Sequence, residues 1–207
     1  MNAPVQTNQK AQLLQNTVEH VDITSFDARP IIDSMRKMSF SSRDTARAAE
    51  VLELIVRQFP TKKDYWPQLW ATYLNLANDK DESKARENFV RAINTVERAQ
   101  AQGFMNTPKD NFNLVSLYIQ VNQFGKATDL LYAGLKSGAI ENDAKNWVYL
   151  GYYYLQLNRN QDALKVLQEA TKLFPNNGQF DLQIGEIYRQ EEKLKEARIH
   201  YREALRR

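Results

Sequence analysis

A pattern of large and small residues recurs at a nearly fixed interval in the second half of this chain. Its members there are Trp147, Leu150, Gly151, Tyr154, Ala163, Leu167, Ala170 and Pro175. Most of them are matched 34 residues later, by Ile184, Gly185, Tyr188, Ala197, Tyr201 and Ala204. Residues that return at such a period indicate an array of similar units, each of which packs mainly on its neighbours.

The pattern extends towards the N-terminus in weaker form. Leu114, Tyr118 and Ala127 precede Leu150, Tyr154 and Ala163 by 36 residues. An earlier unit has Trp70 where the later units have glycine, and its second helix is displaced by an insertion in the polar turn Asn78-Asp79-Lys80-Asp81. We expect that helix to be long, running to about Ala101 before Gly103 ends it. We expect an N-terminal segment 1–27 that is partly disordered, then units at about 28–60, 62–103, 108–140, 144–177 and 178–207.

The small residues of the pattern have a packing role. Two helices can cross closely only where neither presents a bulky side chain. We therefore expect Gly151, Ala163 and Ala170 to lie where the two helices of a unit meet, and Trp147 and Tyr154 to fill the core around them.

The spacing W-x2-L-G-x2-Y, followed by A-x3-L and P, resembles the signature of the tetratricopeptide repeat (TPR) family. The resemblance implies an all-α fold, a right-handed α–α superhelix of about five helix–turn–helix units. It also implies a non-catalytic scaffold or adaptor that binds a segment of a partner protein in its concave groove.

In TPR proteins the first helix of each repeat lines this groove, at positions one, five, eight and nine residues after the signature tryptophan. The resemblance therefore implies a partner-binding groove, for which we select Leu74, Asn75, Phe112, Ile119, Gln120, Val148, Tyr152, Leu155, Gln156, Leu182 and Arg189. The Lys and Asn with which some TPR co-chaperones grip a terminal carboxylate are replaced here by Phe112, Ser116, Val148 and Tyr152. Such a lining favours an extended or helical peptide with apolar anchors.

Several alternatives remain open for this groove. Tyr152 either contacts a partner or is an ordinary exposed aromatic residue. The groove is either occupied by another protein, empty, or filled by the N-terminal segment of the chain itself. A self-associating structural protein, whose groove or ends pack on another copy in a homodimer, is the alternative function.

Catalytic motifs are missing from the sequence. It has no cysteine, and its two histidines, His20 and His200, have no acid or cysteine at ligand spacing, so we expect surface or capping roles for them. Nucleotide-binding and hydrolase signatures are also absent. We therefore expect no enzyme activity, no catalytic residues, no cofactor and no metal.

Charge and hydropathy exclude two further partner classes. The net charge of +3 is made of interspersed acids and bases, without the basic stripe typical of nucleic-acid binding. No apolar stretch is long enough to span a bilayer, so we expect no direct membrane insertion.

A narrower resemblance covers residues 59–205. The strings Phe59-Pro60, Tyr65-Trp66-Pro67-Gln68-Leu69, Gly134-Leu135-Lys136-Ser137-Gly138-Ala139-Ile140-Glu141 and Asn146-Trp147 are similar to those of periplasmic TPR proteins encoded beside TonB-ExbB-ExbD systems. This resemblance implies a periplasmic protein of a TonB-linked envelope transport system. Because the N-terminus shows no signal peptide, a cytoplasmic location is the alternative.

Overall fold

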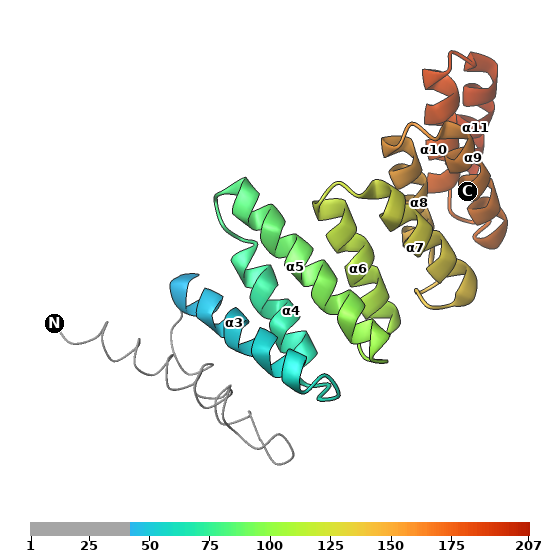
Figure 1. Cartoon of the computed structure of the whole chain (residues 1–207). Helices are drawn as coiled ribbons and strands as arrows, with labels where there is room; N and C mark the ends of the chain where they lie inside the picture. Colours follow the sequence, from blue (N-terminus) through green and yellow to red (C-terminus); the bar gives the residue numbers. More distant parts are fainter. Residues whose placement is uncertain (1–41) are drawn as a thin grey trace. The chain divides into compact units, whose positions relative to one another are not determined.

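A computed structural model describes residues 42–207 of the chain (Figure 1). The predicted N-terminal segment 1–27, and the first part of the unit expected at about 28–60, lie outside this range. The described part contains nine α-helices and no strand, which confirms the expected all-α fold. The helices are α3 (Ser42–Gln58), α4 (Tyr65–Leu76), α5 (Glu82–Ala101), α6 (Pro108–Gln120), α7 (Phe124–Ser137), α8 (Ala144–Gln156), α9 (Asn160–Leu173), α10 (Gln179–Gln190) and α11 (Leu194–Arg206).

The chain divides into two compact units between Met105 and Asn106. In the first unit, α4 packs against both α3 and α5. The insertion predicted from the sequence lies before α5, where the Asp81 carboxylate caps the helix by accepting from the backbone amides of Ser83 and Lys84. As predicted, α5 is long, with 20 residues, and it stops before Gly103, whose φ of +82° ends the helical path.

A polar network ties the three helices of the first unit together. The Tyr73 hydroxyl of α4 donates to the Glu53 carboxylate of α3 at 3.1 Å, and Arg98 of α5 pairs with the same carboxylate at 2.9 Å. The Arg98 guanidinium also lies over the buried Trp66 ring, 5.1 Å from its centroid. Burial, reinforced by the nearby Glu53 charge, raises the pKa of Tyr73 to about 12.

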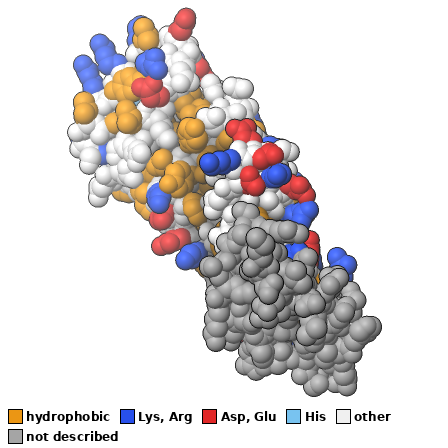
Figure 2. Space-filling model, turned by 90° about the vertical axis from the view of Figure 1, so that its left-hand side faces the viewer, with side chains coloured by type: hydrophobic (Ala, Val, Ile, Leu, Met, Phe, Trp, Pro, Cys, Tyr) orange, Lys and Arg blue, Asp and Glu red, His pale blue; other side chains and the backbone are white. Residues whose placement is uncertain are grey.

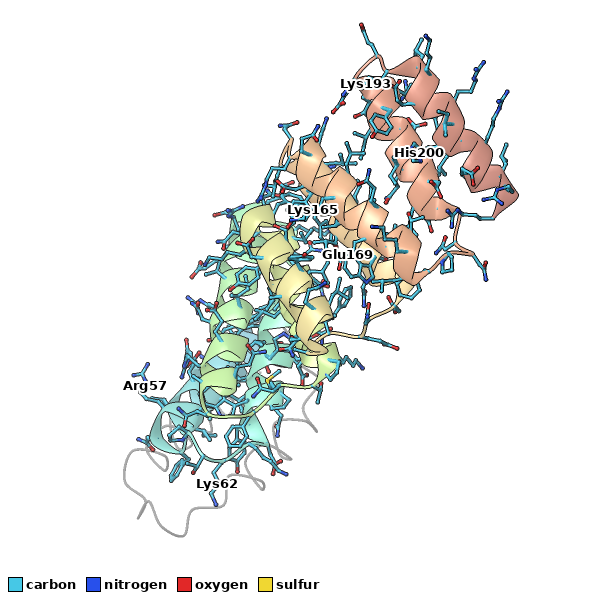
Figure 3. All side chains as sticks on the ribbon, turned by 90° about the vertical axis from the view of Figure 1, so that its right-hand side faces the viewer. Arg57, Lys62, Lys165, Glu169, Lys193 and His200 are labelled. Atoms are coloured by element: carbon cyan, nitrogen blue, oxygen red, sulfur yellow. The ribbon has the colours of Figure 1, made fainter. Side chains whose placement is uncertain are left out.

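The second unit consists of α6 to α11, and each helix packs against the next. The first helices of its pairs, α6, α8 and α10, contact one another on one side. Of the second helices, α7 and α9 contact each other on the other side, where Glu169 of α9 (labelled in Figure 3) accepts from Lys136 of α7. Polar side chains cap the N-termini of two of these helices. Thr107 and Asp110 form a capping box at α6, and the Asp143 side chain caps α8.

Glycines mark the closest approaches within the helix pairs, as the sequence predicted for Gly151. A Cβ atom added to Gly151 of α8 would meet the Leu167 side chain of α9 at 2.7 Å. At Gly178 the neighbour is backbone: an added Cβ would meet the Ala204 carbonyl carbon at 3.0 Å. Ala163 and Ala170 are fully buried, in agreement with their expected packing role.

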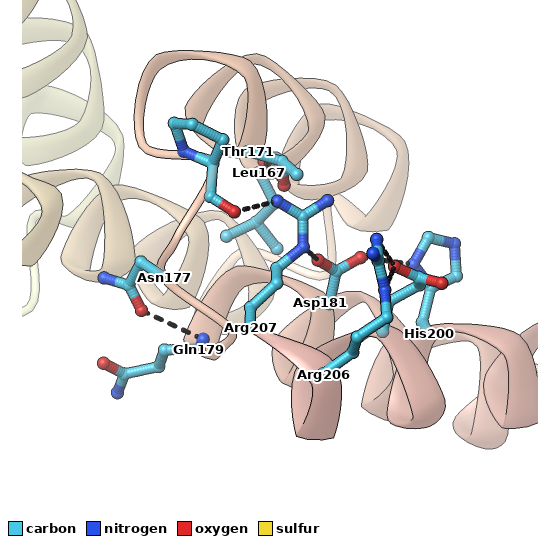
Figure 4. Close-up of polar contacts among 10 residues, drawn as sticks. Leu167, Thr171, Asn177, Gln179, Asp181, His200, Arg206 and Arg207 are labelled. Atoms are coloured by element: carbon cyan, nitrogen blue, oxygen red, sulfur yellow. Dashed lines mark hydrogen bonds and ion pairs between the residues drawn. The ribbon is translucent and has the colours of Figure 1, made fainter.

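The last pair departs from the repeat pattern, because Asp181 stands where the preceding unit has Trp147. Its buried carboxylate lies 2.8 Å from His200 Nδ1 and 2.8 Å from Arg207 Nε (Figure 4). Arg207 also donates to the Pro175 carbonyl oxygen. These partners offset the cost of burying a charged group. His200, expected to be a surface or capping residue, is instead a half-buried partner of Asp181 that stacks on the Tyr188 ring at 5.5 Å.

The backbone contact at Gly178 leads to a stability prediction. Gly178→Ala should destabilise the protein by about 1–3 kcal/mol, because the Ala204 backbone cannot move aside as a flexible side chain would. Gly125→Ala is the matched control, since a Cβ at Gly125 of α7 meets nothing within 4 Å. Gly125→Ala should raise the free energy of unfolding by up to about 1 kcal/mol, because alanine favours the helix more than glycine does. Urea unfolding of both variants checks this, and an unchanged stability for Gly178→Ala would contradict the contact.

The raised pKa of Tyr73 predicts a loss of stability at alkaline pH. The folded state holds this phenol protonated above its ordinary pKa of 10.0, so the stabilisation is complete below that pH and is lost as the pH rises through about 12. Over this interval wild type should lose about 1–2 kcal/mol more stability than Tyr73→Phe, which has no titratable group there. Denaturant unfolding across the interval is the measurement, and parallel losses in both proteins would disprove the assignment.

Candidate functional site

The three first helices of the second unit, α6, α8 and α10, are joined by side-chain contacts. The Phe112 ring of α6 lies 6.1 Å from the Tyr149 ring of α8. The Gln183 amide of α10 donates to the Val148 carbonyl oxygen of α8 at 3.4 Å. Because α8 contacts both of its neighbours, we treat α6, α8 and α10 as one surface and call it the first-helix surface.

A group of five aromatic side chains, here called the aromatic row, lies on and beside α8. Tyr149 and Tyr153 are four residues apart on the helix, so their rings share a face and stack at 6.1 Å with an angle of 11°. Phe112 extends the row from Tyr149, and Phe124 of α7 extends it from Tyr153 at 6.2 Å. Tyr152 joins through Tyr153, with the ring centroids 6.0 Å apart.

The tyrosines of the row present hydroxyl groups that have no hydrogen-bond partner in the described part of the chain. Tyr152 is 49% exposed, whereas Tyr149 and Tyr153 are half-buried. By contrast, the hydroxyls of Tyr73 and Tyr201 donate to carboxylates. Burial raises the pKa of Tyr153 above its ordinary value of 10.0, so its hydroxyl remains a donor well above neutral pH. The row therefore combines aromatic faces with free donors.

One end of the row borders a cavity of about 300 Å³ between the start of α6 and the start of α8. Phe112 belongs to both the cavity and the row, which makes the two continuous. The cavity wall carries charges of both signs, including Lys109, Glu141 and Lys145. The Lys145 ammonium also lies 5.6 Å from the Tyr149 ring centroid. A polar or charged group of a ligand would find partners here, next to apolar rings.

Most of the groove residues predicted from the sequence lie on the first-helix surface. Its exposed members are Gln120, Tyr152, Gln156, Leu182 and Arg189. Phe112, Ile119, Val148 and Leu155 are half-buried. Arg189 is ion-paired with Glu186 at 2.8 Å, so a ligand would have to share it. Leu74 and Asn75 lie on α4, in the other compact unit.

The sequence reasoning missed Tyr149, Tyr153 and Phe124. Tyr149 and Tyr153 were not among the positions that the TPR resemblance assigns to the groove, although their spacing of four residues was a signal that they share a helix face. Phe124 belongs to a second helix, α7, and only the folded chain brings it beside Tyr153.

No group of three or more His, Asp or Glu side chains among residues 42–207 could hold a metal ion. None of the described helices is both long and apolar enough to cross a membrane. Exposed hydrophobic side chains lie instead among acidic and basic ones, as one face of the molecule shows (Figure 2).

Comparison with curated proteins gives short matches. A deoxyhypusine synthase-like protein of Caulobacter vibrioides is 80% identical over 54 residues, which are 26% of this chain and 15% of that protein. A deoxyhypusine synthase-like protein of Coxiella burnetii is 60% identical over 48 residues, 23% of this chain and 14% of that protein. The chain therefore matches only about a seventh of the length of these relatives.

Comparison with family models and solved structures concerns the fold. Residues 150–207 match the family model described as tetratricopeptide repeat. YrrB, described as a TPR protein with an unusual peptide-binding site, aligns with a TM-score of 0.56 and 17% identity over 94% of this chain and 92% of its own. MamA from Desulfovibrio magneticus RS-1 aligns with a TM-score of 0.53 and 16% identity over 95% and 94%. The helix pairs, the glycine contacts and these likenesses together identify the fold as an all-α tetratricopeptide repeat solenoid.

Proposed function

We propose that this protein is a non-catalytic scaffold that binds a peptide segment of a partner protein on its first-helix surface, with the aromatic row as the centre of the contact. The observation that carries the proposal is the row itself, in which stacked rings lie beside three tyrosine hydroxyls that have no hydrogen-bond partner among residues 42–207. Aromatic side chains with a free polar group are the residues that most often dominate binding energy at protein interfaces.

The chemistry of the row suits a peptide segment. Apolar side chains of a bound segment would pack on the faces of Phe112, Tyr149 and Tyr152. An extended segment has backbone carbonyl groups without internal partners, and these would accept from the tyrosine hydroxyls. The exposed amides of Gln120 and Gln156 can bond the same backbone. This combination of apolar anchors and backbone hydrogen bonds is a recurring mode of peptide recognition.

The fold supports the same conclusion. TPR arrays generally act by presenting a surface to a protein partner, and YrrB, a protein of similar fold, is described as having a peptide-binding site. The match to the deoxyhypusine synthase-like proteins is too short to base an activity on, because it spans 15% or less of their length.

A narrower proposal concerns the partner. The strings Gly134 to Glu141 and Asn146-Trp147 favour a segment of a TonB-linked envelope transport complex, and hence a periplasmic location. Fractionation of cells that express the gene tests this directly. Recovery of the protein in the periplasm would support it, and recovery only with cytoplasmic markers would overturn it.

Self-association is the alternative function, because Leu194 and Ile199 of α11 are exposed apolar residues that another copy could cover. Light scattering over a range of protein concentrations separates the two functions. A strict monomer at high concentration supports the scaffold, whereas a mass that rises with concentration and falls in Ile199→Ser supports self-association.

The peptide-binding proposal predicts which substitutions weaken binding. A peptide selected from a random library for binding to the full chain should lose about 2 kcal/mol or more of binding energy, about 30-fold in dissociation constant, on Tyr152→Ala. Phe112→Ala should act in the same direction. Fluorescence anisotropy with the labelled peptide gives the constants, and circular dichroism confirms that the variants are folded.

Leu173→Ala is the matched control for this experiment. Leu173 of α9 is 48% exposed, almost the same as Tyr152, but lies on a second helix. Leu173→Ala should leave the dissociation constant of the peptide unchanged. Equal losses in the Leu173 and Tyr152 variants, or full binding by both Tyr152→Ala and Phe112→Ala, would rule out the first-helix surface as the binding site.

A further inference from the structure

The aromatic row presents more hydrogen-bond donors than acceptors to a bound ligand. The hydroxyls of Tyr149, Tyr152 and Tyr153 have no hydrogen-bond partner among residues 42–207, and a phenol can donate as well as accept. The Lys145 ammonium, 5.6 Å from the Tyr149 ring centroid, can only donate. Helix α8 contains no Asp or Glu. The polar groups of the row therefore carry an excess of positive charge.

The acids of α6 and of the turn before α8 do not balance this charge along the row. Asp110 belongs to the capping box at the start of α6, and the Asp143 side chain caps α8. Glu141 lines the cavity that borders Phe112, at one end of the row. These carboxylates thus lie at helix ends or at the cavity.

Three backbone conformations of a bound segment differ in what they offer to the donors of the row. An α-helix satisfies its backbone carbonyls internally and would offer side chains. A β-strand has as many N–H as C=O groups to satisfy, so it requires acceptors as well as donors. A proline-rich segment in the polyproline II conformation has carbonyls without internal partners, and its prolines have no N–H group. Of the three, the polyproline II segment is complementary in charge to a surface of donors.

The spacing of the rings fits the same conformation. Successive ring centroids, from Phe112 through Tyr149 and Tyr153 to Phe124, are 6.1, 6.1 and 6.2 Å apart. A polyproline II helix rises about 3.1 Å per residue, so each step corresponds to about two of its residues. A segment of about six residues therefore reaches from one end of the row to the other.

We propose that the segment bound by the aromatic row is proline-rich and binds in the polyproline II conformation. Its pyrrolidine rings pack on the aromatic rings, and its carbonyl oxygens accept from the tyrosine hydroxyls and from Lys145. Because this conformation is already formed in the free segment, little conformational entropy is lost on binding. The inference rests on the proposed function, since it names the kind of segment that the same surface binds.

Single-stranded nucleic acid is the rival occupant, because its bases also stack on aromatic rings. Such binding uses a groove of cations that follows the phosphates. Among residues 42–207, one cation, the Lys145 ammonium, lies over a ring of the row. The observations therefore favour the proline-rich segment over nucleic acid.

The test compares two mirror-image probes with the full chain. One is a labelled chain of nine L-prolines, and the other is the same chain of D-prolines, which has equal composition and hydrophobicity but forms a helix of the opposite hand. In fluorescence anisotropy the L-peptide should bind at least about fivefold more tightly, because only its carbonyls follow the hand that the donors match. Equal binding of the two probes, or no binding of the L-peptide, would overturn the proposal.

Removal of hydroxyls tests the pairing of donors with carbonyls. Tyr149→Phe/Tyr152→Phe keeps both rings and should weaken binding of the L-proline chain about tenfold. Tyr132→Phe removes a hydroxyl from the second helix α7, outside the row, and should leave the dissociation constant within about twofold. Circular dichroism checks that both variants are folded. Unchanged binding to the double variant would contradict the pairing on which the proposal depends.

The peptide selected from a random library separates this proposal from the proposed function. Competition between that peptide and the L-proline chain would support both. If the selected peptide depends on Tyr152 and Phe112 while the L-proline chain neither binds nor competes, the proposed function stands and the proline-rich partner is wrong. If neither ligand depends on these residues, the proposed function fails as well.

A single-stranded oligonucleotide is the last competitor in the assay. The proposal predicts that it leaves the L-proline chain bound to wild type. If the oligonucleotide displaces that chain and itself loses affinity on Tyr152→Ala, the row binds nucleic acid and the proposal is overturned.

Discussion

Close contact between the two helices of a pair, made possible by glycine, is the constraint on which the second unit depends. At Gly151 the Leu167 side chain occupies the space of a Cβ atom, and at Gly185 the Tyr201 ring does so at 2.7 Å. Such contacts fix how closely the helices approach in the pairs α8/α9 and α10/α11. Helix α6 joins the same side through the contact of Phe112 with Tyr149 of α8. The first-helix surface, and with it the aromatic row, follows from this regularity.

The residues that build the fold and the residues that we assign to function are therefore different sets. Trp147 and Tyr154 are buried and serve packing, whereas Tyr149, Tyr152 and Tyr153 on the same helix carry the proposed binding surface. The last pair shows that the fold tolerates a change even at a signature position. There Asp181 replaces the tryptophan, and His200 and Arg207 balance its buried charge.

The sequence predicted the helix pairs, the long α5 and the small-residue contacts, because all of these depend on local spacing and on residue size. It also placed Phe112, Val148 and Tyr152 on first helices. It could not predict the contact of Phe124 with Tyr153, because that contact joins two helices of different pairs. Nor could it predict the two partners of His200. One is Asp181, 19 residues earlier, and the other is Tyr188, whose ring stacks on the imidazole. Such contacts depend on how different helices pack together, and the spacing of residues along one helix does not predict that.

Site-directed photo-cross-linking tests the central claim most directly. A photoreactive phenylalanine analogue in place of Tyr152 lies on the first-helix surface, and the same analogue in place of Leu173 lies on α9 at equal exposure. With a bound partner segment, we expect covalent capture from Tyr152 and none from Leu173, with mass spectrometry locating the attached residue. Capture from Leu173 alone would place the partner on the second helices and would contradict the account.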